Sequence, residues 1–74
     1  MTNKDRIKHL TEAKEQAIKQ LDLATVEHRM LQSMVMAKPN ENVENAKIKA
    51  KRIIDTLETK LRIFDDYIAE LDKD

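Results

Sequence analysis

The feature that most constrains this chain is a repeat of apolar and small residues that is mirrored about Pro39, the one proline in 74 residues. On both sides of Pro39 the repeat alternates spacings of three and four, the pattern of a helix that packs along one seam against another helix. The first run is Ile7, Leu10, Lys14, Ala17, Leu21, Ala24, His28, Leu31 and Val35; the second is Val43, Lys47, Ala50, Ile54, Leu57, Leu61, Phe64, Ile68 and Leu71. If the chain folds back at Pro39, partners whose numbers add up to 78 meet along the whole seam. The sequence therefore predicts an all-α fold, an antiparallel two-helix hairpin that resembles a coiled coil.

The facing residues of this seam are complementary in size. Ala17, for example, faces Leu61, and a small residue opposite a large one fills a seam without voids. Two seam positions hold lysines, Lys14 and Lys47, which we expect to lay their stems along the seam and keep their ammonium groups in water. We interpret His28 as a partly buried polar residue that helps to set the register.

The ends of the helices are marked by capping residues. Thr2 and Asp5 fit the start of the first helix, and Asn40 fits the start of the second. Pro39 disfavours helical geometry in the residue before it and so ends the first helix. We expect one helical-hairpin domain over residues 1–74, with a helix at about 3–37, a turn at 38–40 and a helix at about 41–72.

The composition leaves few ways to stabilise such a small fold. A single core below about 80 residues rarely supplies more than about 3–5 kcal/mol, so small domains usually need disulfides, a metal or oligomerisation. The chain has no cysteine and only two histidines, which are too far apart to chelate a metal on one helical turn. The hairpin is therefore expected to assemble into a homo-oligomeric helical bundle, a dimer or larger.

A second apolar stripe follows the C-terminal half of the first helix. Leu23, Val26, Met30 and Met34 are spaced by three, four and four, and at 100° per residue they fall on the side opposite the seam. On the second helix, further apolar residues extend the seam sideways. The predicted interface is Leu23, Val26, Met30, Met34, Ile53, Ile63 and Tyr67. It is interpreted either as packing within the homo-oligomer or as a docking site for another protein, because methionines adapt to a partner's shape.

The segment Asn45–Ile54 carries four basic residues within six positions, Lys47, Lys49, Lys51 and Arg52. Spaced in this way, their side chains wrap around a helix instead of forming one stripe, and Asp55 can pair with Lys51. A solvated surface is the favoured interpretation. The alternative is a contact site for nucleic acid or a small anionic ligand, formed by Arg29, Lys38, Lys47, Lys51 and Arg52.

No motif in the chain indicates catalysis. There is no glycine-rich phosphate loop, no arrangement of a nucleophile beside a base and no HExxH spacing. The formal net charge is zero, so no overall field draws the chain to nucleic acid, and no long apolar run predicts a membrane span. We expect a cytoplasmic, non-enzymatic protein-interaction module without cofactor or metal, acting as an adaptor, a regulator or an inhibitor.

Overall fold

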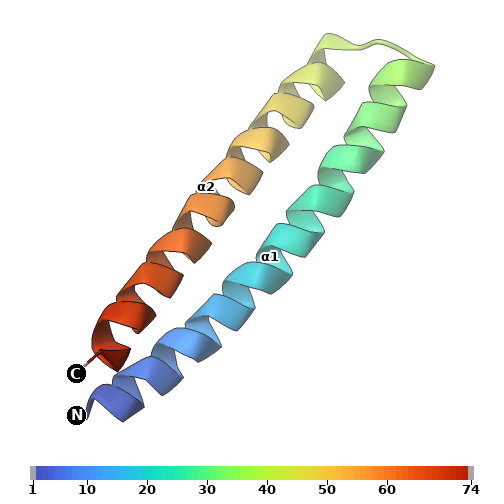
Figure 1. Cartoon of the computed structure of the whole chain (residues 1–74). Helices are drawn as coiled ribbons and strands as arrows, with labels where there is room; N and C mark the ends of the chain where they lie inside the picture. The colour runs from blue at the N-terminus through green and yellow to red at the C-terminus, as the bar shows by residue number, and fades with distance from the viewer. Residues whose placement is uncertain (1, 74) are drawn as a thin grey trace.

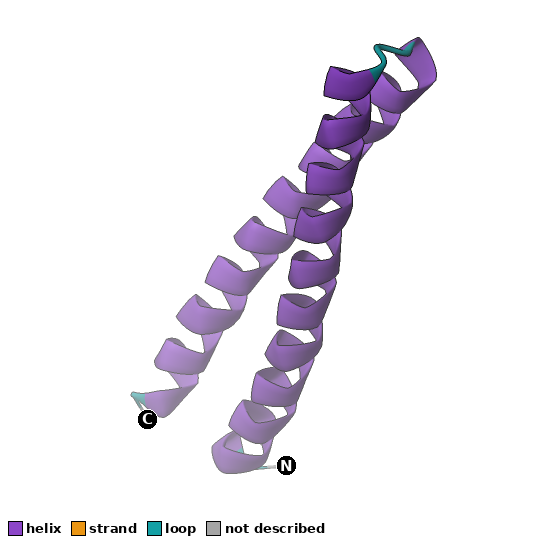
Figure 2. Cartoon of the chain, turned by 90° about the vertical axis from the view of Figure 1, so that its right-hand side faces the viewer, coloured by secondary structure: helices purple, strands orange, loops and turns teal. Residues whose placement is uncertain are grey.

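Two long helices side by side make up the computed structural model, which describes residues 2–73 (Figure 1). Helix α1 spans Asn3–Ala37 and helix α2 spans Glu41–Asp72, and no strand occurs within the described residues. The start of α1 and the end of α2 lie at the same end of the molecule, so the helices are antiparallel. Seen from the side, they cross at a shallow angle (Figure 2), as helices that share a coiled-coil seam do. The all-α hairpin expected from the mirrored repeat is confirmed.

Capping groups fix where both helices start. The Thr2 hydroxyl oxygen accepts a hydrogen bond from the backbone N–H of Asp5 at 3.2 Å. The Asn40 side chain accepts from the backbone N–H of Asn42 at 2.8 Å and so begins α2. Between the helices, Lys38 and Asn40 have extended backbones with φ of −152° and −151°. No residue in the range 2–73 has a positive φ, so the turn is built without the left-handed geometry that favours glycine.

The predicted seam is the buried face of both helices. All 18 of its positions are partly or fully buried, and Asn3 and Ala46 are the only other residues in the range 2–73 that are not exposed. The fully buried core is small and consists of Ala17, Ala24, Ala50, Ile54 and Leu57. Three of these five are alanines, so the hairpin buries little apolar area of its own.

Contacts between the helices fix their register. The Lys14 ammonium forms an ion pair with the Asp65 carboxylate, and Leu10 and Tyr67 line the same hollow. Both pairs have numbers that add up to within one of 78, as the mirrored repeat requires. The ammonium of Lys14 was expected to stay in water, and it pairs with the carboxylate of Asp65 at the solvent-exposed edge of the seam.

The hairpin is long and only two helices thick. Its backbone extends over 54 × 14 × 14 Å. No helix within residues 2–73 combines the length and the apolar character needed to cross a membrane. With no third layer to cover it, each broad side of the hairpin faces outward, and these two sides are where function has to be sought.

Candidate functional site

A shallow groove between the helices, about 490 Å³ in volume, marks one broad side of the hairpin. Its floor is formed by seam residues that include Ala24, Ala50 and Leu57, and Leu23 of α1 and Ile53 of α2 stand at its edges. These two side chains are 72% and 52% exposed. The groove therefore brings together apolar residues that the sequence placed on separate helices, and we call this side of the hairpin the groove face.

Most of the predicted interface lies on the groove face. Residues seven apart occupy equivalent positions along a coiled-coil seam. The groove is lined by Leu23 and Glu27 of α1 and by Ile53 and Thr56 of α2. Met30 lies seven residues after Leu23, and Met34 lies seven after Glu27. On α2, Ile63 lies seven residues after Thr56, and Tyr67 lies fourteen after Ile53. These four members of the predicted interface therefore lie on the same face as the groove. Six of the seven predicted interface residues thus share one side of the molecule.

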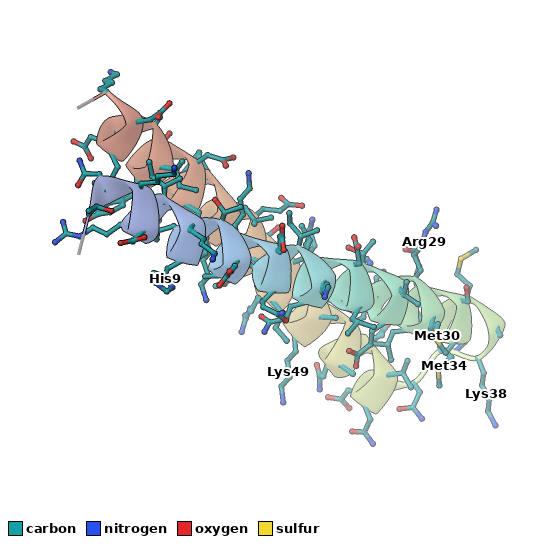
Figure 3. The ribbon with its side chains drawn as sticks, turned by 90° about the horizontal axis from the view of Figure 1, so that it is seen from below. His9, Arg29, Met30, Met34, Lys38 and Lys49 are labelled. Carbon is teal, nitrogen blue, oxygen red and sulfur yellow. The ribbon has the colours of Figure 1, made fainter. Side chains whose placement is uncertain are left out.

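Val26 is the exception, because steps of seven from it reach Lys19 and Ser33, which do not line the groove. The expectation that the whole stripe lies opposite the seam therefore needs correction. Leu23 lines the groove, whereas Val26 does not. Figure 3 shows the two sides: Met34 and Lys49 project to one side of the ribbon and Arg29 to the other.

The apolar side chains of this region are open to solvent in the single hairpin. Met30 is 62% exposed, and Val26, Met34, Ile63 and Tyr67 each have more than half of their surface exposed. Exposed apolar patches of this kind mark interaction surfaces. Three further large apolar residues, Ile18, Met36 and Ile48, are also exposed but lie apart from the groove lining. The sequence analysis did not select them, since none of them belongs to a repeat of apolar residues.

The total surface of the hairpin is larger than its mass requires. It exposes 6021 Å². A folded monomer of 8.7 kDa is expected to expose about 4,700 Å², so the excess is about 1,300 Å². A standard protein–protein interface covers about 800 Å² on each partner. The hairpin thus has as much surplus surface as one interface needs.

Only some of the five basic residues predicted to contact nucleic acid or a small anion lie close together. A hollow of about 410 Å³ between the helices is lined by His28 and Val35 of α1 and by Glu44, Lys47, Ile48, Lys51 and Arg52 of α2, so three of the five predicted contact residues share it. Its positive charge is reduced by Glu44 and by Asp55, whose carboxylate lies 3.3 Å from the Lys51 ammonium. Arg29 and Lys38 do not line this hollow. The pairing of Lys51 with Asp55 expected from the sequence is confirmed.

Within the described residues, no group of three or more histidine, cysteine, aspartate or glutamate side chains is placed to hold a metal ion. The apolar groove and the partly neutralised basic hollow are the candidate binding surfaces that the predicted site residues line. The chain matches no protein-family model, no curated protein and no solved structure. Function has to be inferred from the chemistry of these two surfaces.

Proposed function

We propose that this chain is a non-enzymatic protein-interaction module that works as a homo-oligomer and acts as an adaptor, a regulator or an inhibitor of another protein. The observation that carries the proposal is the open apolar surface around Leu23, Met30 and Ile53. Exposed apolar area of this extent is costly in water, and covering it with protein contributes favourably at about 25 cal/mol per Å². The cysteine-free composition suits a reducing compartment, and we place the protein in the cytoplasm.

The small core supports the homo-oligomeric part of the proposal. Alanine contributes little apolar area, and within the described residues Ile54 and Leu57 are the only large side chains in the buried core. Below about 80 residues a core of this kind supplies only a few kcal/mol (~3–5) against the entropy of ordering the chain. Association that buries further apolar surface adds to the stability of the folded state.

The proposal is tested by placing charge on the apolar stripe. The variant combines Val26→Glu with Met30→Glu, which lie on the exposed side of α1 and outside the seam. The matched control combines Thr25→Glu with Gln32→Glu, which add the same charge to exposed positions on the other flank of α1. We expect helical circular dichroism to persist in both proteins and self-association or partner capture to be lost only in the first. If the variant with Val26→Glu and Met30→Glu keeps the oligomer mass of the wild-type protein and still captures the partner protein, the proposal is contradicted.

A second candidate function is the binding of a small anionic ligand. The observation that favours it is the hollow shared by His28, Lys47, Lys51 and Arg52. Titration with inorganic phosphate tests this candidate, since a multivalent anion should stabilise the hairpin against heat if the hollow binds it. Lys47→Gln should then remove that stabilisation.

A further inference from the structure

We infer that the groove face binds a second copy of this chain, related to the first by a twofold axis that runs along the length of the hairpin. In this dimer the two turns lie at the same end, and α1 of each copy packs on α2 of the other. The inference rests on the proposed function and names the partner that covers the groove face. It predicts a four-helix bundle in which neighbouring helices are antiparallel.

The exposed area matches what such a dimer needs. Each hairpin exposes 6021 Å², about 1,300 Å² more than a folded monomer of its mass is expected to expose. A stable dimer removes about 800 Å² from each partner, so one interface of standard size accounts for most of the excess. The groove face has the apolar edges needed for its centre, Leu23 on α1 and Ile53 on α2.

The twofold axis brings apolar residues of the two copies together. Rotation about an axis along the hairpin keeps each residue at the same position along the length of the molecule. A residue of α1 therefore meets a residue of the second copy's α2 when the numbers of these two residues add up to about 78. Leu23 of one copy then lies within a helical turn of Ile53 of the other, and the same contact occurs a second time by symmetry. Leu23 and Ile53 of each copy thus lie over the groove of the other copy.

Residue sizes on the groove face are complementary in this arrangement. Ala13 of one copy comes opposite Ile63 of the other, and Met30 comes opposite Ala46. A small residue thus meets a large one in both pairs, as it does along the seam inside the hairpin. Ala46 is partly shielded already in the single hairpin, and its short side chain leaves room for a methionine of the second copy.

The charges on the groove face favour this arrangement over a dimer whose two turns lie at opposite ends. Glu27 lines the groove and comes opposite Lys49 of the second copy, and Arg6 comes opposite Glu70. In the single hairpin, the ion pairs formed within residues 2–73 are Lys14–Asp65 and Lys51–Asp55, so Glu27 and Lys49 are available to a partner. Figure 3 shows Lys49 projecting outward from the same side of the ribbon as Met34.

A dimer with its turns at opposite ends would instead pack α1 on α1 and α2 on α2. With the twofold axis at the middle of the hairpin, Glu27 would then lie opposite Gln16, and Glu70 would lie at the height of Val43. Neither glutamate would meet an opposite charge. The arrangement with both turns at one end is therefore the one whose charges are complementary, and complementary charges fix the register of an interface.

Disulfide cross-linking tests the arrangement directly, because the chain contains no cysteine of its own. Two single variants, Leu23→Cys and Ile53→Cys, are mixed, unfolded and refolded together, and oxidised. We expect a covalent dimer of the two variants in high yield and little dimer from Leu23→Cys alone, since the two α1 helices lie diagonally. Val26→Cys mixed with Ile53→Cys is the matched control and should remain uncross-linked. A third variant, Gln20→Cys, should not cross-link to itself.

Charge exchange gives an independent readout. Glu27→Lys and Lys49→Glu should each weaken the dimer at least tenfold in sedimentation equilibrium, because each places like charges opposite one another twice. The double variant Glu27→Lys with Lys49→Glu should restore most of the affinity. Failure of this rescue, or efficient self-cross-linking of Gln20→Cys, would overturn the arrangement and leave the proposed function standing. A wild-type protein that remains monomeric at micromolar concentration would overturn the inference together with the homo-oligomeric part of the proposed function.

Discussion

The ammonium of Lys14 on α1 and the carboxylate of Asp65 on α2 form an ion pair across the edge of the seam. Among residues 2–73 it is the ion pair that joins the two helices, and it lies in the half of the hairpin that is far from the turn. Lys14 is more shielded than its partner, with 31% of its side chain exposed against 57% for Asp65. The pair therefore sits where solvent screens much of its attraction.

From this exposure we predict that the ion pair contributes little to stability. Asp65→Asn should lower the free energy of unfolding by less than about 1 kcal/mol, the range measured for solvent-exposed pairs. Lys14→Leu should leave stability unchanged or raise it, because leucine fills the seam beside Phe64 without a charge to hydrate. Urea denaturation of the two variants checks both expectations. A loss above about 2 kcal/mol for Asp65→Asn would show that the pair is far better shielded than its exposure indicates.

The small residues of the seam should resist enlargement. Ala17 and Ala24 are 3% and 7% exposed, and Ala17→Phe or Ala24→Phe should overpack the seam at a cost of about 1–3 kcal/mol. The control is Ala69→Phe, at an exposed position of α2. Thermal melts should show a lower midpoint for the two seam variants than for the control. Equal midpoints for all three would reject the register in which numbers add up to 78.

The N-cap residue of α2 should contribute measurably to the free energy of unfolding. Asn40 accepts the N–H of Asn42 at 2.8 Å, and Asn40→Ala removes that acceptor. We predict a loss of about 0.5–2 kcal/mol in the free energy of unfolding, the range found for N-cap residues. Asn40→Asp should keep most of the stability, because a carboxylate also accepts the bond and suits the positive end of the helix. Denaturant melts of the two variants, run side by side, measure the difference.

The thermal midpoint of the wild-type protein should rise with protein concentration. Association stabilises the folded state by mass action, so a dimer unfolds at a higher temperature when it is more concentrated. Melts over a hundredfold range of concentration, together with sedimentation equilibrium, provide the measurement. A cooperative melt that is independent of concentration, from a species of 8.7 kDa, would show that the single hairpin is stable by itself.

Nucleic-acid binding should be weak or absent at about 0.15 M salt. A protein that neutralises phosphates releases counterions, so its affinity falls steeply as salt is raised. Here Asp55 already pairs with Lys51, and Arg29 projects to the side opposite Lys49. Fluorescence anisotropy with a short RNA and a short DNA duplex tests the expectation. Sub-micromolar binding that Lys47→Gln with Lys51→Gln weakens would instead favour the basic hollow as the functional site.

The fold could be predicted from the sequence because one pattern determines most of it. Alternating spacings of three and four fix which face of each helix is buried, and Pro39 fixes where the chain reverses. The two helices accordingly cover the expected ranges, Asn3–Ala37 and Glu41–Asp72. Ala46 was missed, since a small residue beside the seam is shielded by its neighbours without belonging to the repeat.

The orientation of the apolar stripe could be predicted only in part. Counting 100° per residue along a straight helix placed Leu23 and Val26 on one outward face. The seam repeats every 3.5 residues, however, and the helices cross, which changes the directions of side chains relative to the neighbouring helix. A repeat of seven counted from the seam would have grouped Leu23 with Met30 and separated both from Val26. The joint lining of the groove by Leu23 and Ile53 depends on how the helices pack, which neither helix's sequence contains alone.

The glycine-free turn at Lys38–Asn40 determines more than where α1 stops. Along the seam, a residue of α1 makes the same contacts with α2 of its own chain as it would make with α2 of another chain. The seam contacts alone therefore do not prevent two molecules from exchanging helices. Only the backbone of the turn, extended at Lys38 and Asn40 and fixed at Pro39, folds each chain back on itself. A residue that accepts helical geometry at position 39 would let the two helices fuse into one rod, and two rods could then rebuild both seams by domain swapping.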